Sequence, residues 1–107
     1  TDPTIDRKDK NKPVQSYEER NIMINSIKYV DEVIEYSTET ELYELLKTLN
    51  PDIRILGSDW KGKQFTGYDL DINIHWHERN HSWSTSSLRK RVYMSEIDKI
   101  EKQFWNK

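Results

Sequence analysis

The sequence predicts one small α/β domain whose helices pack on a parallel sheet. Segments with the apolar spacing of helices alternate along the chain with short β-branched segments, and this alternation is typical of parallel sheets with helical connections. The length of 107 residues is enough for a single domain, since domains commonly run to about 100–150 residues. The expected order is helix, strand, helix, strand, loop, strand and helix.

The composition predicts a thin apolar core. Charged residues make up 34% of the chain, alanine is absent, and the mean hydropathy is -1.01. Because a domain of this size buries only about two-thirds of its unfolded surface, so few apolar side chains favour an incomplete or oligomeric domain.

Charge, cysteine content and hydropathy narrow the function class. The 17 basic and 19 acidic side chains provide no global field that would hold nucleic acid. No apolar run approaches the roughly 20 residues of a membrane span, and none has the form of a signal peptide. The absence of cysteine excludes disulfides, thiolate metal sites and a thiol nucleophile. We therefore expect a soluble cytoplasmic protein that binds neither nucleic acid nor membranes.

The first part of the chain predicts a loop, a helix and a strand. Residues 6–13 are polar and lack apolar periodicity, as in a loop. Ser16 and Glu19 form the capping pattern of a helix over about 17–29. The β-branched segment 30–36 favours a brief strand.

The middle of the chain predicts a helix followed by two strands. Thr38 and Glu41 repeat the capping pattern, and four leucines then recur at helical spacing before an Asn-Pro pair ends the helix. Segments 53–56 and 70–76 favour strands, separated by a loop that contains glycines. On the second strand two isoleucines share one face, namely Ile72 and Ile74.

The last part of the chain predicts two helices. Hydroxyls at 84–87 can cap a helix carrying Leu88, and Ser95 can cap a final helix. We therefore divide the chain into a main domain, residues 1–93, and a C-terminal helical extension, residues 94–107.

The predicted helix start at Ser84 is a candidate anion site. Hydroxyls and unpaired backbone N–H groups gather there, with Arg89 one turn later and Arg79 five residues before. The helix dipole and these donors favour a phosphate. The alternative is a capped helix whose basic face is only solvated.

Two further groups are candidates for ligand contacts. Asp59 and Trp60 end a predicted strand, where open α/β sheets bind ligands, or they form an ordinary turn. Cations on the N-terminal loop can close over a polyphosphate as point charges, or the loop is simply solvated. These cations are Arg7, Lys8, Lys10 and Lys12.

The three histidines are His75, His77 and His81. Imidazoles at i and i+2 can share a zinc ion. Because the chain has no cysteine and Glu78 is the only carboxylate nearby, packing or substrate contact is favoured instead.

Four motifs follow one another at a characteristic spacing: SYEER (16–20), KYVDEV (28–33), GSDWKG (57–62) and WSTS (83–86). In order and spacing they resemble the glycerol-3-phosphate cytidylyltransferases, over about residues 1–92. KYVDEV and GSDWKG are similar to segments specific to this group, whereas the Ser-Thr-Ser motif is similar to that of the wider nucleotidyltransferase superfamily.

The resemblance implies a Rossmann-like nucleotidyltransferase fold and an enzyme that joins CTP to glycerol 3-phosphate, giving CDP-glycerol and pyrophosphate. It also implies a homodimer that uses Mg²⁺. The site residues that it implies are the catalytic lysines Lys10 and Lys12, Lys28 at the acceptor phosphate in place of the family's arginine, and Asp59, Trp60, Arg79, Ser84, Thr85 and Arg89 at the nucleotide.

One family motif has no match in the sequence. It is His-x-Gly-His, whose imidazoles stabilise the charge at phosphorus as pyrophosphate leaves. We expect the first two strands and the first helix of the fold to lie outside this sequence, on the same or a companion chain, so that this chain alone is inactive. The alternatives are a cytidylyl- or adenylyltransferase for another alcohol or sugar phosphate, and a non-catalytic phosphate-binding or dimerisation module.

Overall fold

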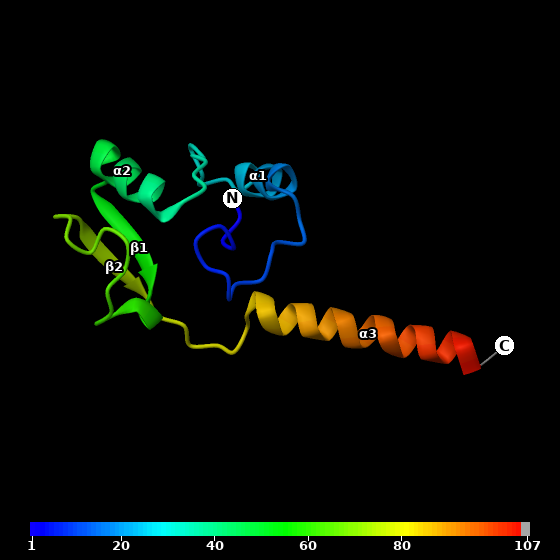
Figure 1. Ribbon diagram of the computed structural model, residues 1–107. Helices are drawn as coiled ribbons and strands as arrows, with labels where there is room; N and C mark the ends of the chain where they lie inside the picture. The colour runs from blue at the N-terminus through cyan, green and yellow to red at the C-terminus, as the bar shows by residue number, and fades with distance from the viewer. Residues whose placement is uncertain (106–107) are drawn as a thin grey trace. The chain divides into compact units, whose positions relative to one another are not determined.

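The computed structural model describes residues 1–105. The chain forms two compact units, Thr1–Trp76 and His77–Lys107. Figure 1 shows the elements, which in chain order are α1 (Tyr17–Asn25), α2 (Glu39–Leu49), β1 (Ile53–Gly57), the 3-10 helix η1 (Ser58–Trp60), β2 (Asn73–His77) and α3 (Thr85–Trp105).

The sheet consists of β1 paired with β2. The two arrows run in the same direction in Figure 1, so the pair is parallel. Residues 58–72 connect the strands and contain η1 followed by a loop, which is long enough for the crossover that a parallel pair needs. The predicted α/β class with a parallel sheet is therefore confirmed.

Helix α2 forms where its leucine spacing predicts. The Thr38 hydroxyl accepts a hydrogen bond from the Glu41 backbone N–H at 3.2 Å, and Asn50 ends the helix in the left-handed conformation with φ 44 and ψ 62. The spacing turns Leu46 toward the loop before β2. That loop approaches the helix closely at Gly67, where φ is +83 and a Cβ would lie 3.0 Å from the Leu46 Cδ1.

Helix α1 begins as predicted and ends early. The Ser16 hydroxyl accepts from the Glu19 backbone N–H at 3.1 Å, and the Glu19 carboxylate accepts from the Ser16 N–H at 3.2 Å. The helix stops at Asn25 and not near residue 29. The Ser26 hydroxyl donates to the Met23 carbonyl at 2.6 Å, and such a local bond competes with continuation of the helix.

The predicted strand over residues 30–36 is wrong, because this segment forms neither helix nor strand. Its β-branched composition favours a strand only where a neighbouring strand supplies hydrogen bonds. Within residues 1–105 the sheet contains β1 and β2 alone. The segment thus has strand composition without a strand partner.

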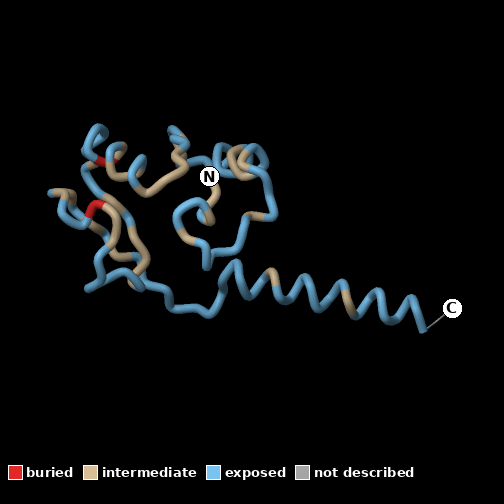
Figure 2. Tube along the Cα trace, viewed as in Figure 1, coloured by how far each residue is buried: buried red, intermediate tan, exposed pale blue. Residues whose placement is uncertain are grey.

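The core is as thin as the composition predicts. Leu46 is the only buried apolar side chain in the part of the chain that the structure describes. Figure 2 shows that almost all of the trace is exposed or intermediate. On β2, Ile74 and Trp76 are half-buried between exposed neighbours, and Ile72 continues the alternation before the strand begins. On β1, by contrast, Ile55 keeps 68% of its surface exposed.

The second unit is dominated by α3, one continuous helix over Thr85–Trp105. The two separate helices predicted here are wrong. Ser95 lies in the interior of the helix and not at a cap, because neither glycine nor proline interrupts the sequence around it. Neither α3 nor any other described helix is long and apolar enough to cross a membrane.

Candidate functional site

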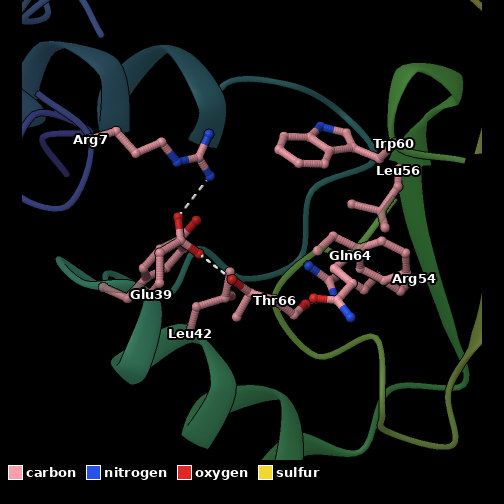
Figure 3. A pocket seen from close by; sticks show the side chains of 10 residues that line it. Arg7, Glu39, Leu42, Arg54, Leu56, Trp60, Gln64 and Thr66 are labelled. Carbon is pink, nitrogen blue, oxygen red and sulfur yellow. Dashed lines mark hydrogen bonds and ion pairs between the residues drawn. The ribbon is translucent and has the colours of Figure 1, made fainter. Parts of the chain in front are cut away.

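A cavity of about 400 Å³ lies beside the carboxyl end of β1 in the first unit. Figure 3 shows the side chains that surround it. Three aromatic rings and two guanidinium groups share its lining with one carboxylate. The lining residues are Arg7, Tyr36, Glu39, Leu42, Arg54, Leu56, Trp60, Gln64, Phe65 and Thr66.

Glu39 joins three segments that are distant in sequence at this cavity. Its Oε1 accepts from the Arg7 Nη2 at 2.8 Å and its Oε2 accepts from the Thr66 hydroxyl at 2.7 Å. Its backbone N–H donates to the Asp6 carboxylate. The first turn of α2 thereby holds the N-terminal loop and the loop before β2 in place.

Two guanidinium groups lie over aromatic rings in the same cavity. The Arg7 guanidinium lies 5.6 Å from the ring centroid of Trp60, and that of Arg54 lies 5.4 Å from the centroid of Phe65. Arg54 also donates to the Thr66 carbonyl. Burial lowers the pKa of Arg54 from its ordinary value, although an arginine remains charged at neutral pH.

The electrostatics of Glu39 follow from its partners. The hydrogen bond from Thr66 lowers the pKa of this carboxyl most, Arg7 lowers it further, and desolvation opposes both. The pKa lies below its ordinary value of 4.5, so the ionised Glu39 carboxylate stabilises the folded chain. This contribution to folding stability is complete above pH 4.5 and is lost as the pH falls through the lowered pKa.

Replacing Thr66 with valine is expected to raise the pKa of Glu39 toward its ordinary value, because the variant removes the hydrogen bond that lowers it most. Loss of that bond should also cost about 1 kcal/mol, since Glu39 is partly solvated. NMR titration of the Glu39 carboxyl carbon measures the pKa. Thr48→Val, whose hydroxyl bonds the Glu44 carbonyl, is the control, and an equal shift in both variants would contradict the prediction.

Sequence reasoning missed most of this cavity. It placed Trp60 at the end of a strand, which the structure confirms, and it treated Arg7 only as one cation of a basic loop. Arg54 could have indicated the cavity from the sequence, because it is a charged residue inside an apolar strand segment. In the structure it lies on the half-buried face of that strand. The contacts of Glu39, which lies 27 residues from Thr66 and 32 from Arg7, left no local signal.

The lysines of the first unit do not line this cavity. Lys10, Lys12 and Lys28 are exposed, and Lys28 Nζ lies 5.6 Å from the ring centroid of Tyr29. Asp59 lies in η1 beside Trp60 but is exposed and not part of the lining. Of the predicted residues in this unit, the structure brings Trp60 and Arg7, one of the cations of the N-terminal loop, to the cavity.

The start of α3 forms a second hollow, which lies within the second unit. The Ser84 hydroxyl accepts from the Ser87 backbone N–H at 3.0 Å, and the Ser84 carbonyl accepts from the Leu88 N–H at 3.0 Å. Ser84 therefore caps the helix, as predicted. The cavity there has about 550 Å³ and is lined by Ser82, Trp83, Ser84, Thr85, Ser87, Leu88 and Arg91.

The loop before α3 is ordered by its own contacts. Arg79 Nη2 donates to the Trp83 carbonyl at 3.3 Å. The Trp83 backbone N–H donates to the His81 Nδ1 at 3.2 Å, and the two rings stack with centroids 4.9 Å apart. The structure thus places Arg79 close to the helix start, whereas the predicted Arg89 does not line the hollow.

No metal site is formed by the side chains that the structure describes. Among residues 1–105, no group of three His, Asp or Glu side chains is placed to hold a metal ion. The zinc site that the histidine spacing allowed receives no support, and neither does a magnesium ion held by the chain's own carboxylates.

Comparison with known proteins gives a family match over most of the chain. The model of the cytidylyltransferase-like family matches residues 2–91. The chain is 32% identical over 81 residues to the bifunctional protein HldE of Wolinella succinogenes, covering 76% of the chain and 17% of that protein. It is 31% identical over 93 residues to HldE of Campylobacter jejuni subsp. jejuni serotype O:6, covering 86% and 20%.

The match therefore spans about one fifth of the length of these curated relatives. A third relative, HldE of Campylobacter fetus subsp. fetus, is 38% identical over 60 residues, which is 56% of the chain and 13% of that protein. No solved structure gives a significant match.

Proposed function

We propose that this chain, which belongs to the cytidylyltransferase-like family and its Rossmann-like α/β fold, is part of a nucleotidyltransferase that joins CTP to glycerol 3-phosphate. An oxygen of the acceptor phosphate attacks the α-phosphorus of CTP. The bond from that phosphorus to the bridging oxygen breaks, and pyrophosphate leaves with the electron pair. The products are CDP-glycerol and pyrophosphate.

The observation that carries this proposal is the start of α3. A helix of 21 residues begins at a hollow lined by hydroxyls and the Arg91 guanidinium, with no carboxylate among the lining residues. The first-turn N–H groups and the helix dipole favour a phosphate there. Ser84 and Thr85 would bind the triphosphate, with Arg79 and Arg89 adding charge nearby.

The cavity beside β1 supports the nucleoside part of the proposal. It lies at the carboxyl end of a parallel strand, where open α/β sheets bind ligands, and Trp60 contributes an aromatic ring to it. In this proposal Asp59 and Trp60 lie beside the nucleobase.

The exposed lysines would supply further positive charge. Lys10 and Lys12 would neutralise the triphosphate as point charges, and Lys28 would bind the acceptor phosphate without the bidentate geometry of an arginine. When bound, Mg²⁺ would neutralise phosphate oxygens. Within residues 1–105 no group of His, Asp or Glu side chains forms a site for it, and no step is assigned to the ion.

The names of the relatives favour a different acceptor or a different nucleotide. Each of the relatives reported above is a bifunctional protein HldE, and none is a glycerol-3-phosphate cytidylyltransferase. The alternative is therefore a cytidylyl- or adenylyltransferase for another alcohol or sugar phosphate. Calorimetric titration of the complete enzyme with CTP and ATP, then with each acceptor phosphate, distinguishes the proposed function from this alternative.

A homodimer and a cytoplasmic location stay predictions.

Changing Ser84 and Thr85 together to alanine is expected to weaken CTP binding by the complete enzyme at least about tenfold, because both triphosphate contacts and the cap are lost. Titration calorimetry measures the affinity, and thermal unfolding measures the loss of the cap, about 1 kcal/mol. Ser95→Ala, in the exposed middle of the same helix, is the matched control. Unchanged CTP affinity together with a lower melting temperature would mean that Ser84 only caps the helix.

A further inference from the structure

Arg54 has hydrogen-bond donors that the rest of the chain leaves unused. It lies on the half-buried face of β1 and lines the cavity beside that strand (Figure 3). Its Nη1 donates to the Thr66 carbonyl, and its guanidinium lies 5.4 Å from the ring centroid of Phe65. Among residues 1–105, no acceptor bonds its Nε or Nη2. One edge of the planar group therefore keeps a pair of parallel N–H donors for a ligand.

The loop before β2 holds this guanidinium in place. A Cβ at Gly67 would lie 3.0 Å from the Arg54 Nη1, and Gly67 has φ +83, so the loop can approach this closely only with a glycine there. Together with the Thr66 carbonyl and the Phe65 ring, the loop fixes the plane of the group before a ligand binds. Donors that are already held in position lose little entropy when they form hydrogen bonds to a ligand.

The lining of the cavity favours a planar ring over a phosphate as the partner of these donors. Three aromatic rings line the cavity, and such rings stack on any base. The Glu39 carboxylate in the same lining would repel a phosphate, and it is already paired with Arg7. Arg54, by contrast, forms no ion pair with a carboxylate among the described residues.

The bases of CTP and ATP differ at the edge that such a pair of donors can recognise. Cytosine presents N3 and O2 as neighbouring acceptors, which match the guanidinium edge in the way that guanine O6 and N7 match an arginine. Adenine places its N6 amino donor beside the N1 acceptor, and uracil carries a proton on N3. Neither of them can accept both hydrogen bonds.

We propose that Arg54 is a specificity-determining residue that recognises the cytosine ring in this cavity, with its Nε and Nη2 donating to cytosine N3 and O2. The assignment rests on the proposed function, because it takes CTP as the nucleotide. Arg54 lies outside the four motifs that carry the family resemblance. The assignment therefore makes the choice of base a property of β1 in this chain.

Titration calorimetry of the complete enzyme with CTP, UTP and ATP tests the assignment through the ratios of the affinities. We expect CTP to bind at least about tenfold more tightly than UTP or ATP. Arg54→Lys keeps the charge but loses the planar pair of donors, and should bring the three affinities to within about threefold of one another. If Arg54→Lys does not fold, Arg54→Gln, which carries no buried charge, should show the same loss of preference.

Arg91→Lys is the matched control, because Arg91 lines the hollow that the proposed function assigns to the triphosphate, which all three nucleotides share. It should weaken all three affinities by the same factor. A preference for CTP that survives in Arg54→Lys would overturn the assignment and leave the proposed function intact, because Arg54 would then only support the cavity. A complete enzyme that binds UTP as tightly as CTP would also overturn the assignment, and one that prefers ATP would overturn the proposed function with it.

Discussion

The 107-residue chain, incubated alone with CTP, glycerol 3-phosphate and Mg²⁺, is expected to release no pyrophosphate above the uncatalysed background. The sequence contains no His-x-Gly-His, and stabilisation of charge at the reacting phosphorus is usually the largest contribution to this chemistry. In the proposed function, the hydroxyls at the start of α3 would bind the triphosphate without accelerating its cleavage. A coupled pyrophosphate assay measures the rate.

The control is a longer polypeptide that contains this chain together with a His-x-Gly-His segment. It should turn over at a rate typical of enzymes, about 1 per second or faster, and lose that activity when both motif histidines are changed to alanine. Turnover at such a rate by the 107 residues alone would show that the chemistry does not depend on the motif.

The two-stranded sheet has free edges, which should leave the backbone amides of β1 poorly protected from exchange with solvent. We expect the backbone amides of β1 to exchange with solvent at least about 100-fold faster in the isolated chain than in a polypeptide that supplies a further strand. A two-stranded sheet is marginal in water, and the face of β1 that carries Ile53 and Ile55 is largely exposed. The unpaired segment 30–36 has the composition of a strand and would pair once a neighbour is present.

Hydrogen exchange by mass spectrometry, resolved over residues 53–57 and 30–36, measures this effect. Helix α2 is the internal control, because its hydrogen bonds are complete within the helix and should gain less protection. The experiment is done at a concentration at which sedimentation shows a monomer. If the isolated chain is a compact monomer that melts cooperatively, the chain completes its own core and the expectation is wrong.

Elements with complete local signals were predictable from the sequence. Helix α2 carries a capping residue, a four-leucine stripe and an Asn-Pro end, and it forms where these lie. Strand β1 and the cap at Ser84 were found in the same way. Each of these signals acts within a few residues, so no knowledge of the rest of the fold was needed.

The errors arose where the outcome depends on distant or absent partners. Segment 30–36 has strand composition, but strand formation requires a neighbour. The interior of α3 was divided at Ser95 because a serine can cap a helix, although the sequence on both sides continues one. Trp60 follows a strand and Ser84 caps a helix, as predicted, and their roles at a nucleotide stay predictions. The network around Glu39 was missed because it joins residues 27 and 32 positions apart.

The ion pair between Arg7 and Glu39 also sets how far the neighbouring lysines can travel. With Arg7 anchored to the first turn of α2, Lys10 is three residues and Lys12 five residues from a fixed point. A fully extended chain then keeps their Cα atoms within about 11 Å and about 18 Å of it. In the proposed function, a tether this short would keep both ammonium groups at an effective concentration in the millimolar range or above for a polyphosphate bound beside the first turn of α2.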